Sequence, residues 1–185
     1  MRELSLHILD IVENGITAGG NCIWIEVEED RKKDYLKILI RDNGRGMPIE
    51  KMENINDPFI TSRTTRRVGL GLSLLAAAVE RCDGTLRVDS QPGKGTEVEA
   101  RFRYDHIDRA PLGDMAATLS SLIIGNPAID FVYCHRIDGK DFDLDTREIR
   151  SQVPDLSLTD PVVIHHLTES IRSALKELAS NEGLS

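Results

Sequence analysis

The sequence predicts an α+β fold, because the pattern of a helix followed by two strands occurs twice between residues 4 and 102. From Leu4 to Ile16, apolar residues recur at the spacing of an amphipathic helix. Two runs of alternating apolar residues follow, as in strands with one buried face. A second helix is expected from Gly69, and it again leads into two strands. The predicted order is helix, strand, strand, long loop, helix, strand, strand.

The first two strands are expected at residues 23–27 and 36–40, on either side of a charged stretch. This pattern is typical of an antiparallel hairpin with a longer loop. The polar segment after it is longer than an ordinary connection and therefore indicates a functional loop. The second helix should end before Asp83, and strands at 86–89 and 98–102 should be joined by a PGKG turn.

The pattern changes beyond Tyr104, so we expect a first domain at residues 1–104 and a C-terminal α/β extension of unknown role at 105–185. The extension can add to the sheet, dock on the helices or form a dimer interface. Its first helix is expected to contain Leu112, Met115, Leu119 and Leu122.

A strand at residues 131–137 and a long final helix complete the extension. Thr159 or Asp160 can cap this helix, and Pro161 suits its first turn. One face of the helix is lined by Ile164, Leu167, Ile171, Leu175 and Leu178.

The composition indicates a cytoplasmic protein with a hydrophobic core, since 40% of its 185 residues are hydrophobic and no apolar stretch has the length of a signal peptide or membrane span. The net charge of -8 argues against sequence-independent binding of nucleic acid. Three widely spaced cysteines support neither a disulfide scaffold nor a zinc site. We expect the five histidines to be structural or surface residues.

Five segments between residues 4 and 103 resemble, in order, the sequence boxes of the GHKL ATPase superfamily, which includes DNA gyrase, histidine kinases and MutL. They are LDIVENGITAGG at 9–20, DNGRGM at 42–47, DPFITSR at 57–63, VGLGLSLL at 68–75 and GKGTEV at 93–98. The resemblance implies a two-layer α/β sandwich of the Bergerat ATP-binding type, with a mixed, mostly antiparallel sheet. It also implies ATP and Mg²⁺ as cofactors.

The base of the nucleotide is expected at Asp42, whose carboxylate can accept a hydrogen from the exocyclic amino group of adenine. Gly44 and Gly46 would let the backbone approach the base, with Met47 beside them. The resemblance also places Thr96 at the adenine end, directly or through water. Without the resemblance, Asp-Asn-Gly is a plain turn signal and Thr96 an ordinary strand residue.

The phosphates are expected at the start of the second helix, where backbone N–H groups have no partner within the helix. The residues of this start are Gly69, Leu70, Gly71 and Leu72. The preceding loop resembles a family lid, in which cations close over the triphosphate, an aromatic residue packs the base of the lid and a threonine stabilises its closed form. The aromatic residue can equally be an ordinary core residue. These lid residues are Phe59, Thr61, Arg63, Arg66 and Arg67. A solvated basic loop is the alternative.

The resemblance makes Asn14 the Mg²⁺ ligand, and an amide oxygen suits this ion. In the gyrase and MutL branches, a Glu four residues earlier orients the attacking water, but here Asp10 takes that place. Asp is shorter by one methylene, which puts efficient hydrolysis in doubt. Glu13 points about 100° away from Asn14 on an ideal helix, so it is a poor substitute.

The sequence therefore predicts an ATP- and Mg²⁺-binding regulatory protein that acts on a separate protein partner, either as a kinase or as a nucleotide-dependent switch. An alternative is a stand-alone ATPase of the MutL or gyrase type that dimerises on binding ATP. A further alternative is a degenerate, non-catalytic binding scaffold. We expect no membrane and no nucleic acid among its partners.

Overall fold

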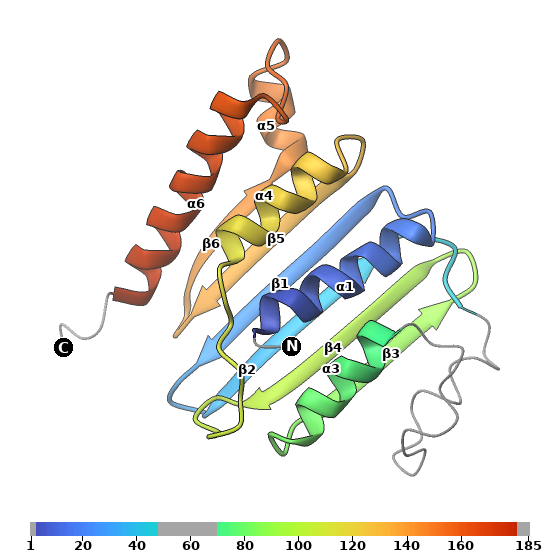
Figure 1. Ribbon diagram of the computed structural model, residues 1–185, viewed down its shortest axis with the longest axis vertical. Helices are drawn as coiled ribbons and strands as arrows, with labels where there is room; N and C mark the ends of the chain where they lie inside the picture. The colour runs from blue at the N-terminus through green and yellow to red at the C-terminus, as the bar shows by residue number, and fades with distance from the viewer. Residues whose placement is uncertain (1–2, 48–69, 181–185) are drawn as a thin grey trace.

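The computed structural model describes residues 3–47 and 70–180, which form a two-layer α/β structure (Figure 1). Its strands are β1 (Cys22–Asp30), β2 (Tyr35–Asp42), β3 (Thr85–Gln91), β4 (Gly95–Arg103), β5 (Asp130–Ile137) and β6 (Lys140–Asp145). Its helices are α1 (Leu4–Thr17), α3 (Leu70–Glu80), α4 (Met115–Gly125), α5 (Thr146–Gln152) and α6 (Pro161–Ser180).

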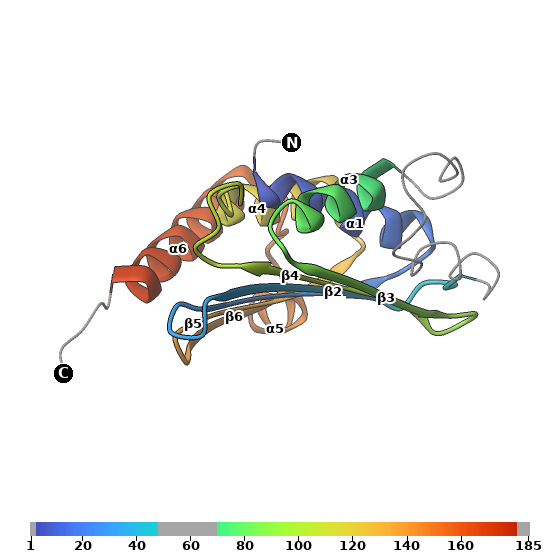
Figure 2. The ribbon, with the colours of Figure 1, turned by 90° about the horizontal axis from the view of Figure 1, so that it is seen from below.

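The six strands form one sheet in the order β3-β4-β2-β1-β5-β6. β1 and β5 run parallel, and the other four neighbouring pairs are antiparallel. Figure 2 shows α1, α3, α4 and α6 on one face of the sheet, with the short α5 on the other. The predicted α+β class, with its mixed and mostly antiparallel sheet, is confirmed.

The alternation of side chains along β1 and β2 explains the hairpin that they form. Ile23, Ile25 and Val27 point toward the helices and are at most 1% exposed. On the opposite face, Lys37 of β2 lies between two carboxylates of β1, with its Nζ 2.9 Å from Glu26 and 2.7 Å from Glu28. The apolar face therefore forms the core, while the charged face pairs across strands.

The C-terminal extension adds to the sheet, because β5 lies beside β1 over eight residue pairs, from Cys22↔Asp130 to Glu29↔Ile137. Side chains of both segments contribute to one hydrophobic core, including Phe131 from the extension. The boundary at residue 104 remains a prediction, but strands on both of its sides share this sheet.

A buried chain of polar contacts also joins β5 to β1. The hydroxyl of Tyr133 lies 2.7 Å from Nδ1 of His135, and Nε2 of His135 lies 2.8 Å from a carboxylate oxygen of Glu29. Tyr133 is fully buried and His135 is 3% exposed. Burial raises the pKa of Tyr133 well above its usual value, so its phenol stays protonated. These contacts satisfy polar groups that would otherwise be buried without partners.

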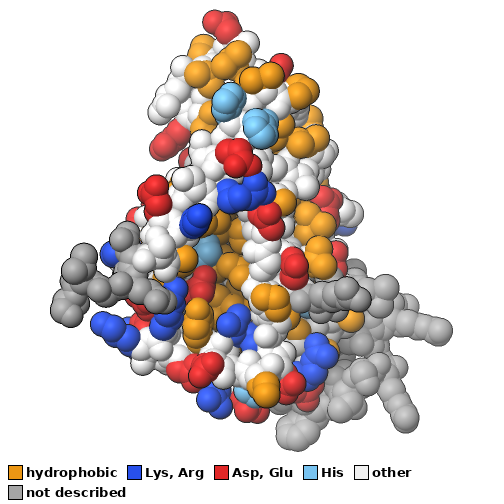
Figure 3. Space-filling view, turned by 60° about the vertical axis from the view of Figure 1, so that its left-hand side comes forward, with side chains coloured by type: hydrophobic (Ala, Val, Ile, Leu, Met, Phe, Trp, Pro, Cys, Tyr) orange, Lys and Arg blue, Asp and Glu red, His pale blue; other side chains and the backbone are white. Residues whose placement is uncertain are grey.

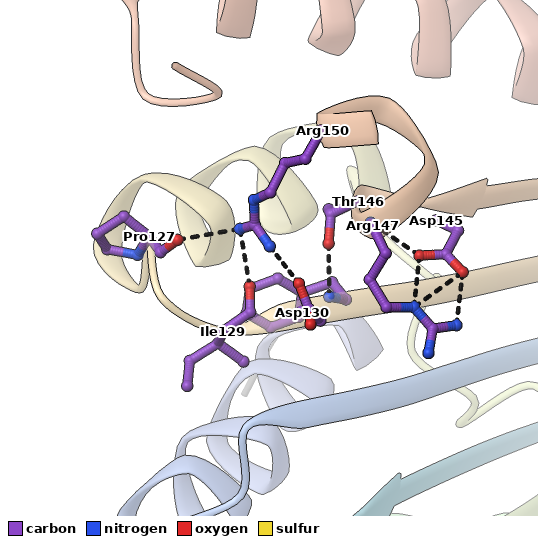
Figure 4. A network of polar contacts seen from close by, with 8 residues as sticks. Pro127, Ile129, Asp130, Asp145, Thr146, Arg147 and Arg150 are labelled. Atoms are coloured by element: carbon purple, nitrogen blue, oxygen red, sulfur yellow. Dashed lines mark hydrogen bonds and ion pairs between the residues drawn. The ribbon is translucent and has the colours of Figure 1, made fainter. Parts of the chain in front are cut away.

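The sequence reading missed β6 and α5, which follow β5. The seven residues of α5 show no apolar period, and the helix is instead fixed by polar contacts (Figure 4). The fully buried Thr146 accepts a hydrogen bond from the N–H of Phe131 at 2.9 Å, and Arg150 pairs with Asp130. Arg150 also donates to the carbonyl oxygens of Pro127 and Ile129, at 3.0 and 3.1 Å.

The two long helices of the extension begin at aspartate caps. Asp160 accepts from the N–H of Val162 at 2.8 Å, as the sequence predicts for α6. The helix predicted around Leu112 begins only at Met115, after the cap Asp114. Gly113 immediately before that cap has φ +89°, and this left-handed backbone keeps Leu112 outside the helix.

Apolar side chains are exposed where α4 ends and α6 begins. Ile124 at the end of α4 is 51% exposed, and Val162 at the start of α6 is 64% exposed. Figure 3 shows apolar side chains gathered beside histidine side chains at this end of the molecule. Among the described residues, no helix combines the length and the apolar character needed to cross a membrane.

Candidate functional site

Helix α1 connects the two ends of the candidate site. A Cβ placed on Gly15 would lie 2.8 Å from the Cβ of Asp42, at the end of β2. A Cβ placed on Gly71, in the first turn of α3, would lie 2.8 Å from the Cβ of Asp10. Five residues of helix span about 7.5 Å along its axis. The predicted base-binding residue and the predicted phosphate-binding turn therefore both lie against one helix.

The base end is a row of three polar residues on neighbouring strands. Thr96 of β4 lies opposite both Asp42 of β2 and Ser90 of β3 in the strand registers. All three belong to the sheet face that the helices cover, since they continue the buried alternation of their strands. Asp42 is 9% exposed and Ser90 is 5% exposed. The sheet thus places carboxylate and hydroxyl groups side by side on its helix-covered face, with Asp42 packed against α1.

Asp42 is held at this position by backbone donors. Its Oδ1 accepts a hydrogen bond from the N–H of Gly44 at 2.8 Å. Burial raises the pKa of Asp42, while the N–H groups of Gly44 and Thr96 act in the opposite direction by stabilising the carboxylate. A Cβ on Gly44 would lie 2.9 Å from this oxygen, so the absence of a side chain there lets the backbone approach the carboxylate closely.

The segment that follows Asp42 is anchored on both sides. Asn43 accepts from the N–H groups of Asn21 and Cys22, at 2.9 and 3.1 Å, which fixes the turn between α1 and β1. The N–H of Arg45 donates to the carbonyl of Ala18 at 3.0 Å. The carbonyl oxygen of Arg45 accepts a hydrogen bond from the N–H of Gly93, in the β3–β4 turn, at 2.8 Å. The segment therefore joins α1 to that turn.

Two glycines make this close approach possible. Gly95 has φ +97°, and a Cβ there would lie 1.9 Å from the carbonyl oxygen of Asp42. Gly46 has φ +66°, and a Cβ there would lie 2.1 Å from the carbonyl oxygen of Gln91. Both positions require left-handed backbone and leave no room for a side chain. The next residue, Met47, donates its N–H to Ser90 Oγ at 2.8 Å.

The other end of the site is the start of α3, which begins at Leu70. Leu72 is only 7% exposed and packs in the core, so only its backbone is available to a ligand. Asp10 is partly buried against this turn, whereas Asn14 is exposed one turn further along α1. Glu13 accepts a hydrogen bond at 3.3 Å from Asn126, the residue after α4, which agrees with its direction away from Asn14.

Six predicted residues lie outside the described part of the chain, which omits residues 48–69. They are Phe59, Thr61, Arg63, Arg66, Arg67 and Gly69.

The structure adds Ser90 and Asn43 to the residues that the sequence analysis selected. The side chain of Asn43 holds the turn between α1 and β1. Its position inside the DNGRGM segment is a sequence signal that could have identified it as a site residue. Ser90 carries no comparable signal, because only the strand register brings it beside Thr96. His7, one turn before Asp10, is 3% exposed, and burial lowers its pKa. Its Nδ1 has no hydrogen-bond partner among residues 3–47 and 70–180.

The polar row at the strand ends can accept hydrogens from a ligand, and the start of α3 can hold the phosphates of a nucleotide. The family model of histidine kinase-, DNA gyrase B- and HSP90-like ATPases matches residues 2–106, more than half of the chain. The chain belongs to this family.

Curated relatives include sensor kinases. The chain is 35% identical over 106 residues to the sensor histidine kinase RcsC of Escherichia coli, a match that covers 54% of this chain and 11% of RcsC. It is 30% identical over 94 residues to sporulation kinase C of Bacillus subtilis, covering 51% and 22%. The match to the non-motile and phage-resistance protein of Caulobacter vibrioides has 31% identity over 125 residues, covering 63% and 15%. The match thus spans less than a quarter of each relative.

Two solved structures are similar to the chain at low sequence identity. The N-terminal domain of a DNA repair protein has a TM-score of 0.50 at 18% identity, and the match covers 78% of this chain and 53% of that one. The MutL ATPase domain of Aquifex aeolicus, solved with ADP, has a TM-score of 0.44 at 13% identity, covering 78% and 63%.

Proposed function

We propose that this chain is an ATP- and Mg²⁺-binding regulatory module that acts on a separate protein, as a kinase or as a nucleotide-dependent switch. The main observation in support is the placement of Asp42 and Asp10 at two ends of one helix-lined site, Asp42 at the strand ends and Asp10 against the start of α3. Membership in an ATPase family supports the nucleotide, and the matches to a sensor histidine kinase and a sporulation kinase favour phosphoryl transfer over simple hydrolysis.

The described residues fit an adenine nucleotide at the base end. Asp42 offers a buried carboxylate, and Gly15 and Gly44 let α1 and the turn after β2 pack closely around it. The carboxylate can accept a hydrogen bond from an exocyclic amino group, and Thr96 stands next to it in the row. In this proposal Met47 and Gly46 complete the surface beside the base.

At the phosphate end, the backbone N–H groups of Leu70, Gly71 and Leu72 would hold phosphate oxygens, because the first turn of a helix has donors without intrahelical partners. Asn14 is exposed on α1 and offers an amide oxygen, so it would be a protein ligand of Mg²⁺. When bound, Mg²⁺ neutralises phosphate charge and orients the terminal phosphate for transfer.

The alternative of a stand-alone ATPase depends on Asp10. Its carboxylate lies at the first turn of α3, with Oδ2 3.3 Å from the position of a Cβ on Gly71. A carboxylate beside the phosphate-binding turn is placed to polarise a water molecule, although it is one methylene shorter than Glu. This position is the specific observation that keeps hydrolysis as the second candidate function.

Replacement of Asn14 by Ala is expected to weaken ATP binding on the order of tenfold in the presence of Mg²⁺, since about 1.4 kcal/mol corresponds to that factor. Binding without Mg²⁺ should change little. Calorimetric titration with ATP, with and without Mg²⁺, measures both values. Glu13→Gln is the matched control, because Glu13 is also exposed but contacts Asn126. If the two variants lose the same Mg²⁺-dependent affinity, Asn14 is not the ligand.

Replacement of Asp10 by Asn separates the two candidate functions. Asn has the size of Asp, so the packing against Gly71 is retained while the basic carboxylate is lost. For an ATPase, phosphate release should fall by about 10²–10⁴-fold with unchanged ATP affinity. For a kinase, labelled phosphate should appear on a separate protein in an extract from the native cell. Absence of ATP binding by the wild-type chain would reject both.

A further inference from the structure

Ser90 stands at the centre of the contacts that organise the base end. It is 5% exposed, and its single hydroxyl contacts three partners. The N–H of Met47 donates to Ser90 Oγ at 2.8 Å, and Ser90 Oγ donates to the carbonyl oxygen of Gly95 at 2.9 Å. Thr96 Oγ1 also lies 2.9 Å from Ser90 Oγ. The hydroxyl is therefore surrounded by an N–H, a carbonyl and a second hydroxyl.

The number of hydrogens on these groups decides the direction of each bond. A serine hydroxyl has one hydrogen to donate and two lone pairs that accept. The N–H of Met47 can only donate and the carbonyl of Gly95 can only accept, so the one hydrogen of Ser90 goes to Gly95. The remaining lone pair of Ser90 must accept the hydrogen of Thr96, because no second hydrogen is left to donate.

The direction of this bond fixes what Thr96 offers to a ligand. Its only hydroxyl hydrogen points to Ser90, so only its lone pairs remain for other contacts. The adjacent Asp42 is a carboxylate in the ionised form and also presents only acceptors. The two residues together form a surface of acceptors, which matches an exocyclic amino group or the hydrogens of a bridging water. An oxygen at the same position of a purine would face lone pairs and be disfavoured.

We infer that Ser90 is a positioning residue that, through Thr96, helps the site to prefer a 6-amino purine to a 6-oxo purine. The inference rests on the proposed function, because it requires the base to lie at Asp42. Ser90 does not contact the base in this inference; it sets the hydrogen-bond polarity of the residue that does.

A structural role alone would have a different signature. Ser90 also holds Met47, so its loss could loosen the whole base end and weaken all nucleotides by one common factor. In Ser90→Ala, however, the hydroxyl of Thr96 is free to turn and to donate to a purine oxygen. The ratio of ATP affinity to GTP affinity therefore distinguishes the two roles.

The test is a titration of ATP and GTP, with Mg²⁺, into the full chain and four variants. The wild-type chain should prefer ATP, and Ser90→Ala should reduce this preference by about tenfold, the factor of a single hydrogen bond of about 1.4 kcal/mol. Thr96→Val keeps the β-branched shape and removes the hydroxyl. Adding Ser90→Ala to Thr96→Val should cause no further loss of preference, because the residue through which Ser90 acts is already gone.

Ser120→Ala is the matched control. Ser120 is 7% exposed and likewise lies beside a threonine hydroxyl, that of Thr168 at 2.6 Å, but it does so between α4 and α6. This variant should leave both affinities unchanged. The inference is overturned if Ser90→Ala weakens ATP and GTP equally, if its effect persists in the Thr96→Val background, or if the wild-type chain binds both nucleotides alike. Binding of neither nucleotide by the wild-type chain rejects the proposed function itself, and this inference with it.

Discussion

Asp42→Asn is expected to remove most of the preference for adenine and to lower ATP affinity by about 10–100-fold, the range for a hydrogen bond to a charged group. Asn keeps one oxygen for the N–H of Gly44, but it replaces the second carboxylate oxygen with an NH₂ donor. That donor would face the amino group of adenine, whereas it can pair with the oxygen of guanine. The affinities for ATP and GTP should therefore converge.

The same variant should keep its fold. Burial raises the pKa of Asp42, so folding disfavours its charged carboxylate. The protonated side chain contributes stability below the usual pKa of 3.8, and this contribution is lost as the pH rises through the raised pKa of the folded state. A neutral Asn avoids this loss at neutral pH. Urea unfolding should show a stability close to that of the wild-type chain, because the N–H groups of Gly44 and Thr96 gain less from a neutral amide than from a carboxylate. Asp89→Asn is the control, since Asp89 is exposed on the other face of the sheet. An unchanged ratio of ATP to GTP affinity would contradict the placement of the base.

Gly95→Ala should be the most damaging of the substitutions considered, lowering the free energy of unfolding by about 2–4 kcal/mol through strain at positive φ and overpacking. A Cβ at this position would lie 1.9 Å from the carbonyl oxygen of Asp42, and both atoms that collide belong to the backbone or are fixed to it. Relief requires β4 to move away from β2 at the point where Thr96 and Asp42 meet. ATP binding should therefore be lost as well.

Gly93→Ala is the control for this prediction. Gly93 lies in the same turn with φ +77°, but a Cβ there would meet no atom within 4 Å. It should lower stability only by the cost of positive φ, about 1 kcal/mol. Urea unfolding of both variants, together with ATP titration, measures the difference. Equal destabilisation by the two substitutions would show that backbone strain alone, and not the contact with Asp42, explains the role of Gly95.

The elements with strong periodicity could be predicted from the sequence. The apolar spacing of α1 and the alternation in β1 and β2 identify those elements, because each buries one continuous face. α5 could not be predicted, since polar contacts of Thr146 and Arg150 fix it and no apolar face marks it. The parallel pairing of β5 with β1 could not be predicted either, because it joins segments that are more than a hundred residues apart in the sequence.

The sequence could propose candidate site residues where they form recognisable segments, as at Asp42 and Asn14, and their roles stay predictions. What the sequence left open is how these segments contact one another. The approach of Gly71 to Asp10 requires two helices to pack side by side, and the polarity of Thr96 requires knowledge of its neighbour Ser90. Such features depend on register and packing, which local patterns do not encode.

The position of β5 has a consequence for the way the chain can be divided. Without residues 105–185, β1 would become an edge strand, and from Cys22 to Glu29 the backbone groups that now pair with β5 would face water or another chain. The same cut would uncover the flank of α1 that packs on α4, next to the turn carrying Asn14. A fragment limited to residues 2–106, which match the family model, would thus be prone to self-association. In the whole chain, β5 covers the edge of β1.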